Sequence, residues 1–257
     1  MVPMAETSTA KKRPAKRPAS KKKSTQKTSK LGLIARFTGL VRRVFLWGTL
    51  GVFGIVLLWT VLYAVINPPT TPYMMSEAHR LVSVRQDWMP IEQIAPVMAR
   101  SAVAAEDANF CLHWGVDVNA IREALDRGRG GASTISQQVV KNVYLWHGRS
   151  WLRKAIEALW TPLTEAVWSK RRIIELYLNV AEFDEGVFGV QAAARHYFSV
   201  DAADLTSLQA ARLAAILPSP KNRSASNPSQ FTRDRTRSIM RGAATIAADG
   251  RADCFEN

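Results

Sequence analysis

Cysteine is scarce in this sequence, which has only Cys111 and Cys254 among its 257 residues. Two cysteines cannot build a disulfide-rich scaffold, and without a Cys-x-x-Cys pair there is no sign of a zinc or thiol redox site. The two lie far apart in the sequence, which does not show whether they pair; unpaired thiols are the expectation. A His-Glu-x-x-His metal motif is also missing, and the scattered His79, His147 and His196 are expected to be structural.

Acidic residues are nearly absent from the N-terminal end. Residues 1–43 hold 13 of the 35 Lys and Arg but one of the 21 Asp and Glu, so the remainder keeps 22 basic and 20 acidic residues. The net charge of +14 therefore belongs mainly to a tail, and no nucleic-acid partner is expected, since such a domain would carry its own basic patch. With little apolar surface to bury, residues 1–43 are predicted to be a disordered basic tail that ends in a short amphipathic stretch.

Charge is missing altogether from residues 44–66, a run rich in Leu, Val, Ile, Phe and Trp. As a helix it would be about 34 Å long, enough to cross a bilayer, so we predict one transmembrane helix. A buried core helix rarely runs so long without charge, and a cleaved signal peptide would be shorter and followed by a small-x-small site. The excess of Lys and Arg before the run predicts a cytoplasmic N-terminus and a C-terminal domain on the other side.

The rest of the chain has little strand character. Residues 67–85 are predicted to be a connector and residues 86–257 a mainly α-helical domain, because apolar residues recur at helical spacing and no alternating strand is evident. The expected helices cover residues 91–108, 116–125, 133–145, 151–168, 171–180, 187–197 and 207–217.

Adjacent acids end the first of these helices. On a helix, Glu106 would share one face with Phe110 and His113, and an apolar run precedes it. A dry setting raises the pKa of a carboxyl group and suits a general base. A solvated helix end is the simpler interpretation of Glu106-Asp107 taken alone.

Two further segments are rich in groups that bind anions. Glycines precede Ser133 and Thr134, either of which could cap a helix whose N-terminus, with Arg127 and Arg129 nearby, suits a phosphate or diphosphate. Gly-Lys-Ser/Thr is missing, so this is not a P-loop. Arg153 and Glu157 are spaced as helix neighbours, which by themselves indicate no more than a surface ion pair.

Together and in this order, these segments resemble the peptidoglycan glycosyltransferase family, which includes monofunctional biosynthetic transglycosylases and the glycosyltransferase domains of class A penicillin-binding proteins. The first segment fits E-D-x-x-F-x-x-H-x-G-x-D, from Glu106 to Asp117. The second and third fit G-x-S-T-I-x-Q-Q-x-x-K-N, from Gly131 to Asn142, and R-K-x-x-E, from Arg153 to Glu157. Two further matches are K-x-x-I-L-E-x-Y-L-N at 170–179, with Ile for Leu at 174, and Gly189 with the Tyr-Phe pair at 197–198. Gln209 departs from the usual Glu, at a position expected to be structural.

The resemblance implies a lysozyme-like helical fold with a membrane-proximal jaw, in a single-pass protein of the bacterial inner membrane with its catalytic domain in the periplasm. It implies polymerisation of lipid II onto a growing glycan chain, with β-1,4 bonds formed by inversion and undecaprenyl diphosphate released. Glu106 would be the general base, and Glu157 the second carboxylate, which acts through a divalent ion (Mg or Mn) or orients the cations. The substrate-binding residues would be Asp107, Phe110, His113, Arg129, Ser133, Thr134, Gln137, Gln138, Lys141, Asn142, Arg153 and Lys154. Cell-wall synthesis proteins are the expected partners.

Two other functions compete with polymerisation. A muramidase or lytic transglycosylase would share the fold and a catalytic Glu, but it gives no reason for the cationic residues around Lys141 and Arg153. A non-catalytic scaffold for wall synthesis would not need Glu106 and Glu157. Ser-x-x-Lys occurs twice between residues 20 and 27, but Lys-Thr-Gly is absent, so no transpeptidase is expected.

Overall fold

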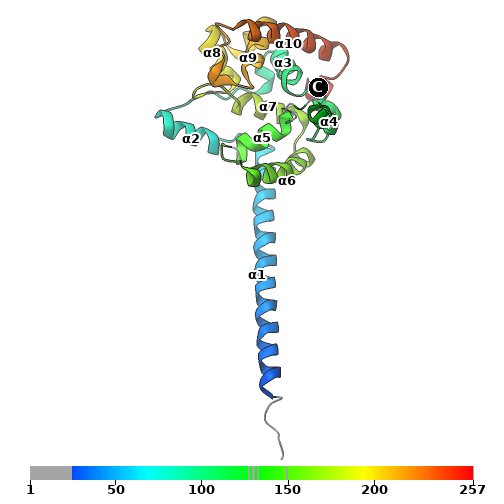
Figure 1. Ribbon diagram of the computed structural model, residues 1–257. Helices are drawn as coiled ribbons and strands as arrows, with labels where there is room; N and C mark the ends of the chain where they lie inside the picture. Colours follow the sequence, from blue (N-terminus) through cyan, green and yellow to red (C-terminus); the bar gives the residue numbers. More distant parts are fainter. Residues whose placement is uncertain (1–24, 127, 129–130, 132, 149, 257) are drawn as a thin grey trace, which may run out of the picture. The chain divides into compact units, whose positions relative to one another are not determined.

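The computed structural model describes residues 25–126, 128, 131, 133–148 and 150–256 (Figure 1). The chain forms two compact units, residues 1–54 and 55–257. The first 24 residues of the predicted disordered tail lie outside the described residues. The mainly α-helical class predicted from the sequence is confirmed.

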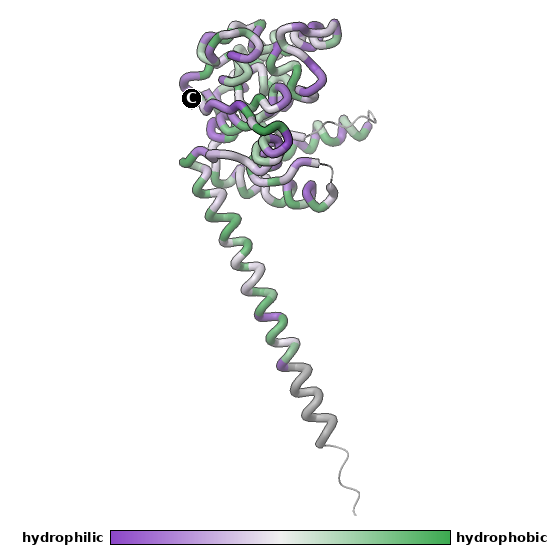
Figure 2. Tube along the Cα trace, turned by 90° about the vertical axis from the view of Figure 1, so that its left-hand side faces the viewer, coloured by the Kyte–Doolittle hydropathy of each residue, from purple (hydrophilic) through white to green (hydrophobic). Residues whose placement is uncertain are grey.

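Helix α1 runs from Thr25 to Tyr63, and its segment Arg36–Tyr63 is long and apolar enough to cross a membrane, with a mean hydropathy of 2.1 in the most apolar window. Green, hydrophobic residues dominate this segment in Figure 2. Disorder was the wrong prediction for residues 25–43, which are helical. No proline follows Pro18 in the tail, and each residue added to an existing helix gains a hydrogen bond without a new nucleus.

The last turns of α1 belong to the second unit. Thr60 is buried; its hydroxyl accepts a hydrogen bond from Trp160 Nε1 at 2.9 Å, and its carbonyl accepts one from Trp168 Nε1 at 2.7 Å. The helix ends at Tyr63, three residues before the end of the predicted span, and Arg172 donates hydrogen bonds to the carbonyl groups of Tyr63 and Ile66. Residues 60–63 are therefore part of the fold of the second unit.

The second unit is built from helices joined by short loops. In chain order they are α2 (Pro72–Leu81), α3 (Pro96–Glu106), α4 (Val118–Asp126), α5 (Ile135–Tyr144), α6 (Trp151–Val167), α7 (Lys170–Val180), α8 (Val190–Phe198), α9 (Ser207–Ile216), α10 (Gln230–Ala248) and α11 (Asp253–Glu256). Helices α3, α9 and α10 pack together, and α5 packs against α6 and α7 (Figure 1). The core between them includes Met98, Leu176 and Leu213, each fully buried.

Serine and threonine define most helix starts. The hydroxyl groups of Ser150, Ser169 and Ser229 accept hydrogen bonds from backbone N–H groups in the first turns of α6, α7 and α10. Thr206 caps α9 in a capping box with Gln209, whose Oε1 accepts a hydrogen bond from Thr206 N at 2.9 Å. The glutamate that is usual at this position would accept the same hydrogen bond, so the capping box forms equally well with Gln209.

Besides the four-residue helix α11 and the short 3₁₀ helices, three elements were not predicted from the sequence. Helix α2 lies within the predicted connector, and α10 follows the last expected helix. Both have faces lined by small or polar residues, such as Thr232 and Thr236 of α10, which weaken the apolar periodicity. The third element is a small sheet of strands β1 (Arg85–Gln86), β3 (Val187–Phe188) and β2 (Glu182–Asp184), in that order, with β1 parallel and β2 antiparallel to β3. Strands this short carry no recognisable alternation.

Gly189 shows why the segment after the sheet needs a glycine. Its φ of +81° lies in the left-handed region, and a Cβ there would approach the carbonyl oxygen of Asn179 to 2.9 Å. Its N–H donates to the Ala181 carbonyl at 2.9 Å, so the turn before α8 is packed against the end of α7.

The two cysteines form a disulfide, so the expectation of unpaired thiols was wrong. Cys111 and Cys254 are 143 residues apart in sequence, but α11 packs beside the loop that follows α3, and their Cα atoms are 5.8 Å apart. Phe110 and Phe255, the neighbours of the two cysteines, pack with ring centroids 6.2 Å apart. Separation along the chain says nothing about separation in space, which is why the sequence misled.

Replacing both cysteines with serine is expected to lower the free energy of unfolding by about 2–5 kcal/mol, the usual range for a native disulfide. Denaturant unfolding of the detergent-solubilised chain, with and without reductant, measures the change. Reductant should destabilise the wild type and leave the double serine variant unaffected. Equal unfolding midpoints for the two proteins in the absence of reductant would contradict this prediction.

Candidate active site

Glu106 is the last residue of α3. Asp107 leaves the helix with a φ of −161°, and the chain continues through a short 3₁₀ helix, Phe110–Leu112. The prediction of one helix over residues 91–108, with Glu106, Phe110 and His113 on a shared face, was therefore wrong in its geometry. At the other end α3 begins late, because Pro96 holds the preceding residue in an extended conformation.

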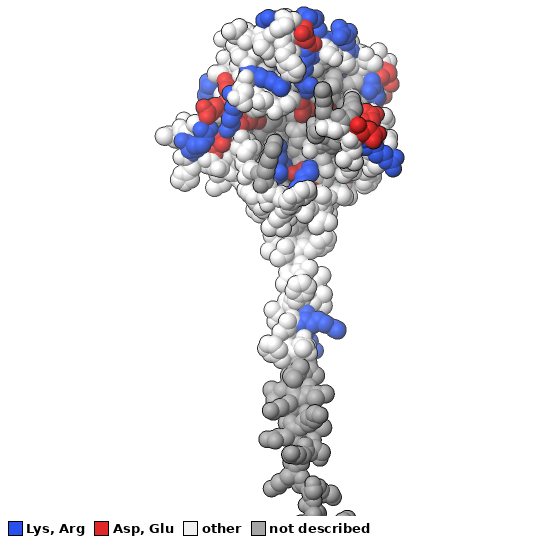
Figure 3. Space-filling model, in the orientation of Figure 1, with Lys and Arg blue, Asp and Glu red and all other residues white. Residues whose placement is uncertain are grey.

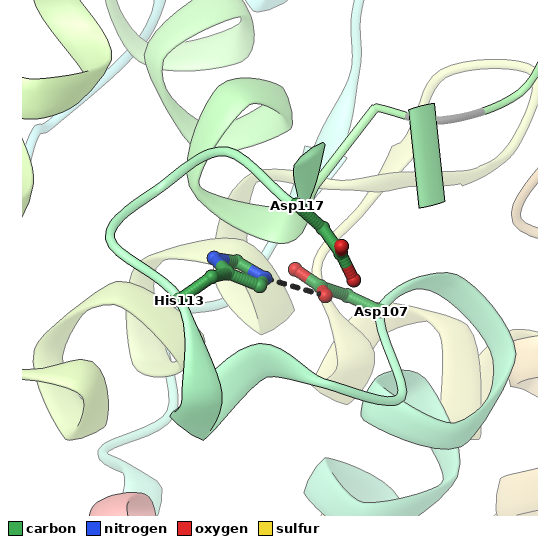
Figure 4. Close-up of side chains that lie close together, drawn as sticks. All are labelled: Asp107, His113 and Asp117. Carbon is green, nitrogen blue, oxygen red and sulfur yellow. Dashed lines mark hydrogen bonds and ion pairs between the residues drawn. The ribbon is translucent and has the colours of Figure 1, made fainter. Parts of the chain in front are cut away.

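The loop after α3 is held by a network around Asp107, His113 and Asp117 (Figure 4). His113 Nε2 lies 2.8 Å from one oxygen of Asp107, and the backbone N–H of Ile135 donates to the other at 3.0 Å. The two oxygens of Asp117 accept hydrogen bonds from Ala120 N and from the Asn109 side chain, both at 2.9 Å.

These three side chains could be mistaken for a metal site, since one ligand atom from each lies within 4.8 Å of the others. All four carboxylate oxygens, however, already accept or share hydrogen bonds within the protein. The cluster therefore joins the loop after α3 to the N-terminus of α5, and we assign it a structural role.

Helix α5 begins where the sequence predicted a capped helix. Thr134 is the N-cap, in a capping box with Gln137. The Thr134 hydroxyl also donates to the carbonyl of Gly115 at 2.6 Å. Gly115 has a φ of +75°, and a Cβ there would lie 2.6 Å from Thr161 of α6, so only glycine lets the loop pass between α5 and α6.

A buried ion pair beneath this loop was not predicted. Glu165 of α6 accepts from Lys170 Nζ at 2.8 Å and from the hydroxyl of Ser136. Lys170 Nζ also donates to the carbonyl of His113 at 2.8 Å and lies 4.4 Å from the centre of the Phe110 ring. These contacts tie the loop to α6 and α7 as well as to α5.

Glu106 is joined to α5 through Gln138, whose Nε2 donates to Glu106 Oε2 at 2.9 Å. The Glu106 side chain is only 12% exposed. Burial raises the pKa of this carboxyl above its ordinary value, against the opposing effects of Gln138, Arg235, Lys141 and Arg223. A carboxylate with a raised pKa in a dry setting is suited to accept a proton.

Lys141 lies one turn after Gln138 on α5 and is partly buried between charged groups. Burial lowers the pKa of its ammonium group, while the carboxylates of Glu157 and Glu106 both raise it. On α6, Arg153 Nη1 donates to Glu157 Oε2 at 2.8 Å, and Lys154 donates to Glu157 Oε1. Glu157 is buried, so its charge is balanced by two cations that it holds in place.

A cleft of about 280 Å³ opens beside Lys141. The wall from α5 consists of Gln138, Lys141 and Asn142. The lining also includes Tyr73 of α2, which the sequence did not indicate. Its ring stacks on His147 at 4.1 Å, and its hydroxyl donates to Glu182. Figure 3 shows acidic and basic side chains mixed over the visible face of the second unit, as its near-neutral charge predicts.

The predicted site residues fall into three groups. Hydrogen bonds or charge interactions link the members of the first group, which are Glu106, Gln138, Lys141, Arg153, Lys154 and Glu157. Ser133 joins this group because its hydroxyl accepts a hydrogen bond from Lys154 Nζ at 3.4 Å. The buried side chains of Asp107, Phe110, His113, Thr134 and Gln137 have internal contacts that support the loop and α5, and their direct contact with substrate stays a prediction. Asn142 lines the cleft, and Arg129 lies outside the described residues.

The chain is similar to known proteins over most of its length. A family model described as "Transglycosylase" matches residues 74–244. A protein of Jannaschia sp. (strain CCS1) named "Biosynthetic peptidoglycan transglycosylase" is 56% identical over 237 residues, which is 92% of this chain and 98% of that protein. Proteins with the same name from Caulobacter vibrioides and Yersinia pseudotuberculosis are 44% and 41% identical, over 76% and 77% of this chain and 87% and 89% of their own lengths.

Proposed function

This chain belongs to the transglycosylase family, and from that membership we propose that it polymerises the glycan strands of bacterial peptidoglycan from lipid II. The acceptor 4-hydroxyl attacks the anomeric carbon of the donor, and its proton goes to Glu106. A β-1,4 C–O bond forms as the α-linked bond to the diphosphate breaks, and that bond's electron pair leaves on undecaprenyl diphosphate. The configuration is inverted.

One observation carries this proposal: helix α5 presents both Gln138, which donates to Glu106 at 2.9 Å, and the cation Lys141 to the same cleft. A base and a cationic centre for an anionic leaving group are thereby brought to one cleft. The hydrogen bond from Gln138 keeps Glu106 beside the cleft that Lys141 lines. A muramidase has no use for such a cationic centre, because it releases no diphosphate.

The cations account for the departure of the diphosphate. As the bond to the anomeric carbon breaks, negative charge grows on the phosphate oxygens, and positive groups already in place stabilise it. Lys141 supplies a point charge, and Arg153 supplies a planar fork of donors. Glu157 orients Arg153 and Lys154.

A divalent ion at Glu157 fits this arrangement poorly, because each of its oxygens already accepts from a cationic side chain. We therefore assign Glu157 the second of its two expected roles, the orientation of Arg153 and Lys154. A metal requirement can be measured by chelation with EDTA followed by return of Mg²⁺ or Mn²⁺.

The apolar helix suits an enzyme whose substrate is carried by lipid, and we propose that α1 anchors the chain in the bacterial inner membrane. The excess of Lys and Arg before the span supports a cytoplasmic N-terminus and a periplasmic catalytic domain. The disulfide supports the same orientation, because disulfides persist in oxidising compartments. Exposed apolar side chains on α6, Trp151, Leu152 and Leu159, suit the membrane-proximal jaw that the family resemblance implies.

The full chain in detergent, incubated separately with lipid II and with mature peptidoglycan, distinguishes the candidate functions. A polymerase converts lipid II into long glycan that a muramidase can digest, and it leaves mature peptidoglycan intact. Release of fragments from mature peptidoglycan would indicate a lytic enzyme. Inactivity towards both substrates would favour a scaffold within the wall-synthesis machinery.

A further inference from the structure

Helix α10, which no motif indicated, brings a cation to the proposed base. Arg235 Nη2 lies 3.6 Å from Glu106 Oε1 and donates to the carbonyl of Ala105 at 3.0 Å. Its side chain is 30% exposed, against 12% for Glu106. One guanidinium group therefore contacts both the last carboxylate of α3 and a carbonyl group in the last turn of that helix.

The two oxygens of Glu106 have different surroundings. Oε2 accepts from Gln138, whereas Oε1 is buried and accepts no hydrogen bond from any described residue. At 3.6 Å, Arg235 acts on Oε1 through its charge rather than through a short hydrogen bond. The oxygen that lacks a hydrogen bond is thus the one that Arg235 approaches.

A helix C-terminus is an unfavourable place for a carboxylate, because the exposed carbonyl groups carry partial negative charge. Glu106 is itself the last residue of such a helix, α3. Arg235 binds the carbonyl of Ala105 at the end of α3, and Arg223 binds the carbonyl of Ala215 at the end of α9 at 3.1 Å. Each helix end is therefore neutralised by an arginine that also acts on Glu106.

The groups that face Glu106 come from several elements. Helix α5 contributes Lys141 and Gln138, α7 contributes the buried Tyr177, and Arg223 follows the turn after α9. Asp107, the next residue along the chain, is directed into the network with His113 and Ile135. Lys141 is shared with Glu157 and, in the proposed reaction, with the diphosphate, which leaves the two arginines as the cations dedicated to Glu106.

Close packing of α10 on α3 makes the contact possible. Gly242 lies two turns after Arg235, and a Cβ at this glycine would come within 3.1 Å of the Ala104 Cβ. A larger residue at 242 would push the helices apart and draw Arg235 away from Glu106.

We infer that Arg235, supported by Arg223, is a positioning residue that keeps Glu106 ionised and directed as the base of glycosyl transfer. The inference rests on the proposed function. Its consequence is a defined pH dependence: without the cation, the pKa of Glu106 rises further, so the base is protonated at a pH where the wild-type residue is ionised.

The test compares Arg235→Gln with Arg235→Lys in polymerisation of lipid II by the full chain, with kcat/KM measured across the pH range in which the wild type is active. For Arg235→Gln, the acidic limb of the kcat/KM profile should move to a pH about one unit higher. At pH values below the limb, kcat/KM should then be about tenfold lower than that of the wild type, and at pH values above the limb it should be nearly the same as that of the wild type. Arg235→Lys keeps the charge and should move the limb much less. Arg237→Gln, on the same helix but 61% exposed and paired with Asp234, is the matched control and should leave the limb in place.

A loss of the same factor at every pH in Arg235→Gln, with the limb unmoved, would reduce Arg235 to a structural role and overturn the inference. So would wild-type activity and an unchanged profile. The proposed function fails separately: it is contradicted if the wild-type chain makes no glycan from lipid II, or if Glu106→Gln retains activity.

Discussion

Replacement of Glu106 by Gln is expected to lower the rate of polymerisation by about 10²–10⁴-fold, the usual contribution of a general base. The amide cannot accept the proton of the acceptor hydroxyl at neutral pH. It can still share a hydrogen bond with Gln138 and occupies nearly the same volume, so the fold should be retained. The measurement is the rate of glycan formation from lipid II, with helical content and unfolding midpoint recorded on the same sample.

The raised pKa of Glu106 gives this prediction a pH signature. A base must be ionised to act, so wild-type kcat/KM should rise with pH through the pKa of Glu106, which burial holds above the ordinary value. The residual activity of Glu106→Gln should lack that rise. Near-normal synthesis by the variant would remove Glu106 from the role.

Replacement of Lys141 by Ala is expected to lower kcat by about 10²–10³-fold, as is typical when a group that stabilises developing charge is removed. Donor binding should weaken too, which raises KM for lipid II. Lys141→Met retains most of the buried stem without the charge and should resemble Lys141→Ala. Similar effects of the two variants therefore indicate loss of the ammonium group rather than a packing defect.

The two cationic positions should differ in their response to pH. Loss of Lys141 removes a contact to the leaving diphosphate, which no rise in pH restores, whereas loss of Arg235 acts through the ionisation of Glu106. Lys141→Arg should recover only part of the activity, since a planar fork does not replace a compact ammonium group. An unchanged response of Lys141→Ala to lipid II would count against a phosphate contact.

Much of the candidate site could be predicted from the sequence, because its residues lie in short contiguous motifs. Gln138 and Lys141 follow a recognisable N-cap, and the spacing of Arg153 and Glu157 places both on one face of α6. The apolar helix within α1 could also be predicted, since a long uncharged segment is typical of a membrane-spanning helix.

Other features depended on contacts between distant parts of the chain. Arg235 lies on α10, 130 residues after Ala105, whose carbonyl group it binds beside Glu106. No local sequence pattern distinguishes Arg235 from the other arginines of α10. The sequence also predicted a helix that continues to residue 108, whereas α3 ends at Glu106 and the Asp107 side chain binds the N-terminus of α5. In both cases tertiary contacts, rather than local preference, decided the structure.

The bond between Cys111 and Cys254 sets an order for the maturation of this protein. It closes a loop of 143 residues, so oxidation has to wait until everything from α4 to α11 has been synthesised. By then the intervening helices can already have packed, and the crosslink secures an assembled domain rather than guiding its assembly. Oxidation therefore follows the synthesis of every helix that the loop encloses.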